Sequence, residues 1–180
     1  MTDANPPVTV AEPEGWRWTP GRIVGIALTL AIAGFWIWAF SPLPQRGNPD
    51  RMSDRAFPVA AETICEGAMV DIAALPPATS VTSLDERADL VDEGTVVIRV
   101  MVADLGELTV DNAEEAAWVE AWLDDYATYA DDRDNFAAAL RAGDDSAPEF
   151  TVRGVEGVQT LIFGFAKVNE MSSCIGPGDV

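Results

Sequence analysis

Histidine is absent from this chain of 180 residues, and cysteine occurs only twice. Without histidine the chain has no ordinary catalytic triad, lacks the usual zinc ligand and has no side chain that normally titrates near neutral pH. The two cysteines, Cys65 and Cys174, do not form a C-x-x-C pair, so the sequence predicts no metal site and no cofactor. A phosphate-binding loop is also missing, because no Lys-Ser or Lys-Thr follows the glycines at 154 and 157.

Positive charge is scarce, with 11 Lys and Arg against 30 Asp and Glu, and the net charge is −19. Residues 1–55 contain equal numbers of acids and arginines, so the whole excess lies in residues 56–180. Such a surface is unsuited to nucleic acid, because affinity for phosphates depends on cations, and anionic lipid headgroups repel it. An acidic coat that keeps the domain soluble is the simplest interpretation, and a basic partner or loosely held cations are the functional alternative.

The chain has one long apolar run, the eighteen residues from Ile23 to Phe40, which contain no charge. A helix of that length reaches about 27 Å, close to the ~30 Å hydrocarbon core of a bilayer. Tryptophans flank both ends, at 16, 18, 36 and 38, as is typical of interfacial aromatic belts. The run exceeds the ~7–15 apolar residues of a signal peptide, so the sequence favours a retained transmembrane helix over a cleaved signal.

The orientation of this helix depends on the cysteines. Basic residues near its ends are almost balanced, with Arg17 and Arg22 before the helix and Arg46, Arg51 and Arg55 after it. Both cysteines follow the helix, and an even count is compatible with one disulfide, which persists only in an oxidising compartment. We therefore expect a Cys65–Cys174 disulfide, a cytoplasmic N-terminus and an extracytoplasmic C-terminal domain. A cytoplasmic domain with two free thiols is the alternative.

Four segments follow from composition. Residues 1–22 form a disordered Pro-rich tail, 23–40 the transmembrane helix, 41–55 a loose Pro-rich linker, and 56–180 one acidic domain. Small residues in the apolar run, at 27, 31 and 34, could let two helices approach closely, so a weak homo-oligomer is an open alternative.

Within the domain, apolar residues recur at helical spacing over 57–75, 83–105, 111–141 and 151–172. Ser83 to Glu86 forms a capping box, Asp111 to Glu114 repeats the start signal, and Gly143 is a stop. The fold class is therefore mostly α, with one N-terminal transmembrane helix followed by a four-helix-type domain. The alternative is α+β, with strands near 95–102 and 157–166, where β-branched residues and glycines gather. If Thr95–Val102 is helical, we expect it to be buried on every side.

The chain resembles a group of small actinobacterial envelope proteins. Ten arginines accompany one lysine, with abundant Ala and Asp, and the layout over residues 57–180 is "TIC…AWVEAWLDDYATYADDRDNFAAALRAGDD…FAKVNEMSSCIGPGDV". The resemblance implies an N-terminal hydrophobic segment followed by a helical domain with one cysteine early and one near the end. It implies no particular activity.

Carboxylates are the remaining candidates for chemistry. The densest clusters are Asp131, Asp132 and Asp134, and Asp144 and Asp145. Neither has the spacing of a calcium-binding EF-hand loop, so we interpret both as solvated surface. Trp118 and Trp122, one helical turn apart, are expected in the core, whereas an exposed pair would indicate a surface for a partner or a sugar.

These observations predict a single-pass membrane protein, not an enzyme, that presents a helical module to another envelope protein. Its expected partners are the lipid bilayer, contacted through the helix, and an envelope protein, but no nucleic acid. The alternative function is an extracytoplasmic hydrolase that works through carboxylates.

Overall fold

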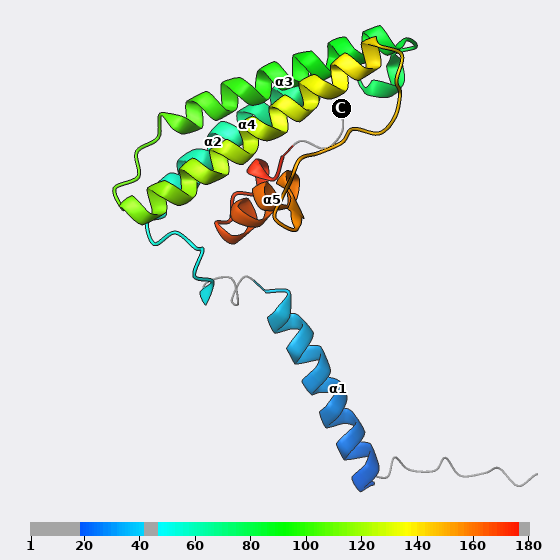
Figure 1. The fold of residues 1–180 in the computed structure, drawn as a ribbon. Helices are drawn as coiled ribbons and strands as arrows, with labels where there is room; N and C mark the ends of the chain where they lie inside the picture. Colours follow the sequence, from blue (N-terminus) through cyan, green and yellow to red (C-terminus); the bar gives the residue numbers. More distant parts are fainter. Residues whose placement is uncertain (1–18, 42–46, 177–180) are drawn as a thin grey trace, which may run out of the picture. The chain divides into compact units, whose positions relative to one another are not determined.

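The computed structural model describes residues 19–41 and 47–176 (Figure 1). The chain divides into an N-terminal unit, residues 1–44, and a C-terminal unit, residues 45–180. Most of the tail predicted over residues 1–22 lies outside the described residues.

The N-terminal unit contains a single described helix, α1 (Pro20–Ala39). It starts three residues before the predicted span, with proline in its first turn, where the missing N–H is not needed. Its polar Thr29 is satisfied internally, because the hydroxyl donates to the carbonyl of Gly25 over 2.9 Å. By length and composition, α1 is suited to cross a membrane.

The C-terminal unit is a helical domain, as the sequence predicted. It is built from α2 (Ala56–Ala73), α3 (Leu84–Gly106), α4 (Ala113–Arg141) and α5 (Val158–Val168), with short 3₁₀ turns η2 (Ala78–Ser80) and η3 (Ser172–Cys174). The strands β1 (Val152–Arg153) and β2 (Glu156–Gly157) form a two-residue antiparallel ribbon. In Figure 1, α2, α3 and α4 run alongside one another and the shorter α5 lies beside them.

Local capping signals set the ends of the long helices. The capping box is present at the start of α3, where Ser83 accepts from the backbone of Glu86 and the Glu86 carboxylate accepts in return. At the start of α4 the cap is Asn112. At its end, Gly143 has a φ of +87° and donates to Leu140, and Asp144 donates to Ala139, both over 3.0 Å. This pair of bonds is a Schellman motif, which the glycine makes possible.

The segment Thr95–Val102 is helical, so the strand alternative is wrong there. It is not buried on every side, however. Ile98 faces the core, whereas Val96 and Val100, one turn apart on another face, are 60% and 56% exposed. The partners of α3 are mainly α4 and α2, and they leave this stripe in solvent. Burial of the inner face offsets the low helix propensity of the β-branched residues.

The prediction of one helix over 151–172 is wrong at its start. Gly154 has a φ of +68°, which suits a tight turn and interrupts a helix. Val155, one of the apolar residues within the predicted helix, is 96% exposed at this turn. The ribbon is anchored to α4 by Asp132, whose carboxylate accepts from the backbone and hydroxyl of Thr151 over 2.7 and 2.8 Å. Within residues 151–172 the α-helix is confined to Val158–Val168, so the strand alternative over 157–166 is also wrong.

Residues 50–55 pack onto the domain and do not form a loose linker. Met52 is fully buried, and its backbone N–H donates to Oδ1 of Asn169 over 2.9 Å. Ser53 donates from its backbone and its hydroxyl to Oε1 of Glu115, over 2.7 and 2.6 Å. These hydrogen bonds show that the folded domain starts before residue 56. The sequence did not reveal this, because the partners Asn169 and Glu115 lie far along the chain, beyond the reach of any local pattern.

Arg51 and Arg55 belong to the same attachment. Each forms an ion pair with Oε2 of Glu170, over 3.0 and 3.1 Å, and each donates to a carbonyl at the end of α5. Two of the arginines used in the charge count around the apolar run are therefore engaged by the domain.

Candidate functional site

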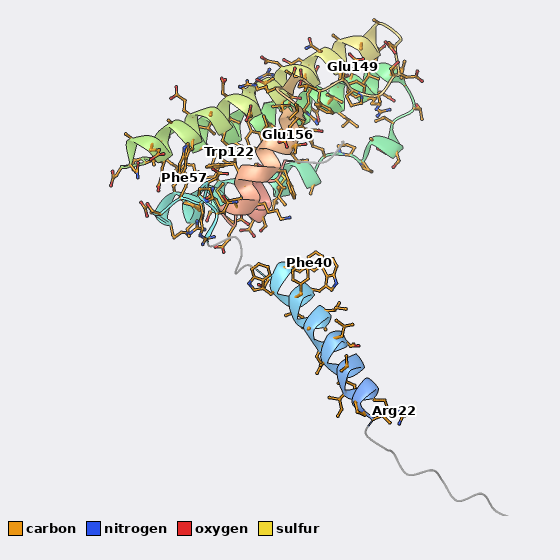
Figure 2. The ribbon with its side chains drawn as sticks, turned by 60° about the horizontal axis from the view of Figure 1, so that its bottom comes forward. Arg22, Phe40, Phe57, Trp122, Glu149 and Glu156 are labelled. Atoms are coloured by element: carbon orange, nitrogen blue, oxygen red, sulfur yellow. A yellow bond between two sulfur atoms is a disulfide. The ribbon has the colours of Figure 1, made fainter. Side chains whose placement is uncertain are left out.

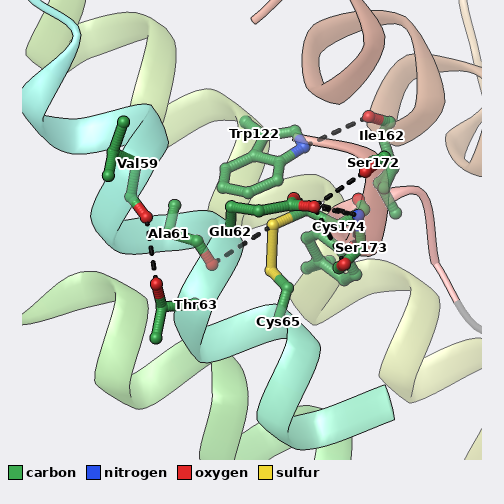
Figure 3. Close-up of a disulfide and its surroundings, with 11 residues drawn as sticks. Val59, Ala61, Glu62, Thr63, Cys65, Trp122, Ile162, Ser172, Ser173 and Cys174 are labelled. Carbon is green, nitrogen blue, oxygen red and sulfur yellow. Dashed lines mark hydrogen bonds between the residues drawn. A yellow bond between two sulfur atoms is a disulfide. The ribbon is translucent and has the colours of Figure 1, made fainter. Parts of the chain in front are cut away.

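The structure joins the two cysteines in one disulfide, between Cys65 on α2 and Cys174 on η3 (Figure 3). Both are fully buried. Beside them Glu62 of α2 accepts from the backbone of Ser173 over 2.9 Å and from the hydroxyl of Ser172 over 2.7 Å. The covalent bond and this carboxylate together hold the C-terminal turn against α2.

The acidic clusters do not form one site. Asp131 and Asp134 form ion pairs with Arg99 over 2.9 and 2.8 Å. Asp132, in contrast, is buried and accepts hydrogen bonds from Thr151. Asp144, on the loop after α4, accepts from Ser146. No group of three or more potential metal ligands converges within the part of the chain that the structure describes.

A groove between α4 and α5 brings aromatic and acidic residues together. Its volume is about 390 Å³. We call it the α4–α5 groove, and it is lined by Asp50, Trp118, Ala121, Trp122, Asp125, Glu156, Thr160, Leu161, Gly164, Phe165 and Val168. On α4 the spacing of 118, 121, 122 and 125 is that of one helix face. Figure 2 shows Trp122 and Glu156 beside α5.

Trp122 forms the rigid wall of this groove. It is buried, as expected, and its indole N–H donates to the carbonyl of Ile162 over 3.3 Å. Its ring meets Tyr126 edge-on at a centroid distance of 5.3 Å and lies 5.1 Å from Phe165. Trp118, also expected in the core, packs against it but is only half-buried and lines the groove. The aromatic surface open to the groove belongs to Trp118 and Phe165, which are both partly buried, and the buried ring of Trp122 supports it from behind.

Asp125 supplies a buried acceptor at the same place. The residue is only 9% exposed, and its Oδ1 accepts no hydrogen bond. Nε of Arg153 lies 3.3 Å from this oxygen, close enough for an ion pair but without the alignment of a hydrogen bond. Burial raises the pKa of Asp125; the charge of Arg153 opposes the shift and that of Asp124 adds to it. A buried carboxylate oxygen without a donor is costly, so this atom favours a ligand that donates to it.

Two further acids line the groove. Asp50 is held in place because its carbonyl accepts from the side-chain amide of Asn169 over 3.3 Å. Glu156 is held by the ribbon, in which it pairs with Arg153. None of the described residues that line the groove is basic.

A second hollow, of about 440 Å³, lies where α3 ends and α4 begins. Its walls are mostly aliphatic, with Glu120 and Asp124 among them. None of the described residues that line it buries an unsatisfied polar atom. It therefore lacks the feature that marks the α4–α5 groove as a site for a specific ligand.

Trp118 and Trp122 were recognisable from the sequence, whereas Asp125 and the groove were not. The available signal was the position of Asp125, which continues the aromatic stripe one turn further along α4. The other wall could not be inferred, because it depends on how α5 packs. In comparisons with known proteins, no family model, no curated protein and no solved structure matches this chain.

Proposed function

We propose that this protein is a single-pass membrane protein whose N-terminus is cytoplasmic and whose C-terminal domain lies outside the cytoplasm. There the domain acts without catalysis of its own, as a module that binds another envelope protein. The observation that carries the proposal is the α4–α5 groove, a preformed aromatic and acidic surface on a disulfide-bonded domain.

The location rests on two features. The helix α1 has the length and composition of a membrane span. The buried Cys65–Cys174 disulfide belongs to an oxidising compartment, since cytoplasmic thiols are kept reduced. Together they favour an anchor that leaves the domain on the extracytoplasmic side.

The binding role rests on rigidity and exposure. Trp122 is fixed by its hydrogen bond and by its ring neighbours, and Trp118 beside it keeps part of its surface in solvent. A half-buried tryptophan such as Trp118, set in a hollow with a few polar groups, is typical of protein interfaces, where large aromatic residues contribute much of the binding energy.

The location is tested by labelling intact cells with a membrane-impermeant maleimide, before and after reduction. The mass of the labelled full-length chain is then measured by mass spectrometry. Labelling of Cys65 and Cys174 only after reduction supports the proposal. Labelling after lysis without reductant, but not in intact cells, contradicts it. The same mass distinguishes a retained anchor from a cleaved signal peptide, because cleavage removes about forty residues.

Binding is tested by placing a photo-cross-linking amino acid at Thr160, in the groove, and at Val96, on the exposed face of α3. A discrete adduct from Thr160 in living cells that is lost when Trp118→Ala is added, together with no adduct from Val96, supports a binding groove. Equal adducts from both positions, or none from Thr160, contradict it.

A carboxylate-dependent hydrolase is the second candidate, and the raised pKa of Asp125 favours it. A carboxyl group that holds its proton at higher pH is suited to general acid catalysis. Turnover of model glycosides or esters by the purified protein, abolished by Asp125→Asn but not by Asp131→Asn, would favour this candidate over a binding module.

A further inference from the structure

We propose that the α4–α5 groove receives a lysine or arginine side chain of an extended segment of the partner protein, with its cationic group at Asp125 and its aliphatic stem against Trp118 and Phe165. This inference deepens the proposed function and rests on it.

The length of the groove suits an extended peptide. Along α5 the groove-lining positions run from Thr160 to Val168, which is about 12 Å at ~1.5 Å per residue. Along α4 they run from Trp118 to Asp125, which is about 10 Å by the same rise. Extended chain advances ~3.3 Å per residue, so three or four residues span the groove.

The electrostatics select a cation. Asp125 lines the groove, and its buried Oδ1 accepts no hydrogen bond and faces Nε of Arg153 over 3.3 Å. Asp50 and Glu156 are two further acidic residues of the lining. The nearby Arg153 compensates only part of this charge, because it also pairs with Asp124 over 3.3 Å. A guanidinium or ammonium group brings the N–H donor that Asp125 lacks together with the opposite charge.

The aromatic walls select a side chain with an apolar stem. Lysine and arginine carry three or four methylene groups below the charge, which can lie along Trp118 and Phe165 while the head reaches the carboxylate. A cation over an indole face gains further stabilisation. A small inorganic cation would use the carboxylates but would leave the exposed part of Trp118 without a partner.

Other occupants fit less well. Anionic lipid headgroups and nucleic acid are repelled by the charge of the domain. A second copy of this chain has the same net charge of −19, so its acidic surface would approach three carboxylates. A basic segment of a different protein meets the charge requirement, and the field of the domain accelerates its association.

The first test uses the full-length protein in detergent micelles, labelled with 5-fluorotryptophan and observed by ¹⁹F NMR. The probe is the peptide acetyl-Ala-Leu-Lys-Leu-Ala-amide, compared with the same peptide carrying norleucine or glutamate in place of lysine. We expect the lysine peptide to shift the Trp118 and Trp122 resonances in a saturable way, and Trp36 and Trp38 to stay unchanged. The norleucine peptide should bind at least tenfold more weakly and the glutamate peptide should not bind. Equal affinity of the lysine and norleucine peptides, or no shift at Trp118, overturns the inference.

Variants locate the cationic contact. Asp125→Asn should weaken the lysine peptide at least tenfold, whereas Asp131→Asn, the same charge change on an exposed position of the same helix, should leave its affinity within twofold. Trp118→Ala should weaken the lysine and norleucine peptides alike, because it removes the apolar wall and not the charge. Equal effects of Asp125→Asn and Asp131→Asn overturn the assignment, since they would reflect net charge alone.

Cross-linking in cells separates this inference from the proposed function. An adduct from Thr160 whose partner peptide has Lys or Arg within two residues of the cross-linked position supports both. An adduct to a segment without a basic residue overturns the inference and leaves the binding function standing. The absence of an adduct that depends on Trp118 overturns both.

Discussion

Met52 donates its backbone N–H to the side-chain oxygen of Asn169 over 2.9 Å, a contact between positions that are 117 residues apart. Both residues are fully buried. The amide of Asn169 in turn donates to the carbonyls of Asp50 and Phe165, so one side chain joins the segment before α2 to the end of α5. The chain that leads from the N-terminal unit is thus attached to the same helix that forms one wall of the α4–α5 groove.

Replacing Asn169 with alanine should destabilise the domain by about 2–3 kcal/mol, because the buried N–H of Met52 loses its acceptor and a buried side chain is truncated. The measurement is urea unfolding monitored by circular dichroism. Asn135→Ala, at an exposed position of α4, is the matched control and should change stability by less than about 0.5 kcal/mol. Equal effects of the two variants would show that the Asn169 bonds do not hold this segment.

The attachment at Ser53 should weaken in acid. Hydrogen bonds from the Ser53 hydroxyl and backbone N–H hold the pKa of Glu115 below its usual range. A carboxyl whose pKa is lower in the folded state stabilises that state above the unfolded pKa, about 4.3, and this contribution is lost as the pH falls through the folded pKa. Hydrogen exchange of the Ser53 amide should therefore accelerate as the pH drops below about 4, relative to its intrinsic rate.

Glu115→Gln should remove this pH dependence, and Glu114→Gln, at the neighbouring exposed position, should leave it intact. Local exchange is the appropriate readout, because the raised pKa of Asp125 contributes to global acid unfolding with the opposite sign. Protection of Ser53 that is independent of pH in the unchanged protein would contradict the assignment to Glu115.

Removing the disulfide should destabilise the domain by about 2–4 kcal/mol, because it closes a loop between cysteines 109 positions apart and restricts the unfolded chain. The variant is Cys65→Ala with Cys174→Ala, compared in urea with the oxidised parent. We also expect faster hydrogen exchange at the Ser173 amide, which donates a hydrogen bond to Glu62 beside the removed disulfide. A change below about 0.5 kcal/mol would mean that non-covalent packing alone holds η3 in place.

The turn before α5 offers a direct test of the ribbon. Val155→Ser should change stability by less than about 0.5 kcal/mol, because this side chain is almost fully exposed. Val158→Ala should cost about 2 kcal/mol, since that side chain is completely buried at the start of α5. A continuous helix from residue 151 predicts a substantial cost at both positions, so thermal unfolding of the two variants distinguishes the arrangements.

Local sequence patterns predicted the structure correctly where contacts between neighbouring residues determine it. The Ser83–Glu86 capping box, the 3–4 spacing through residues 84–105 and Gly143 predicted the start of α3 and the end of α4, because capping and turn bonds join residues close in sequence. The same reasoning failed at Val155, where apolar spacing indicated a helix. There Gly154 adopts a left-handed conformation and Asp132 binds Thr151 from a distant helix. Apolar periodicity alone does not reveal such an anchor.

The sequence by itself determined the apolar span, the mostly helical domain, the partition of negative charge and the presence of two cysteines that one disulfide can join. Each follows from composition or from spacing within a few turns. Only the tertiary structure decided that residues 50–55 belong to the domain, that Trp118 keeps a free face and that Asp125 buries an oxygen without a hydrogen bond. These properties arise where α4 meets α5 and where Asn169 and Glu115 bind a distant segment. Such contacts depend on which helix faces pack together, which the order of residues along one helix does not specify.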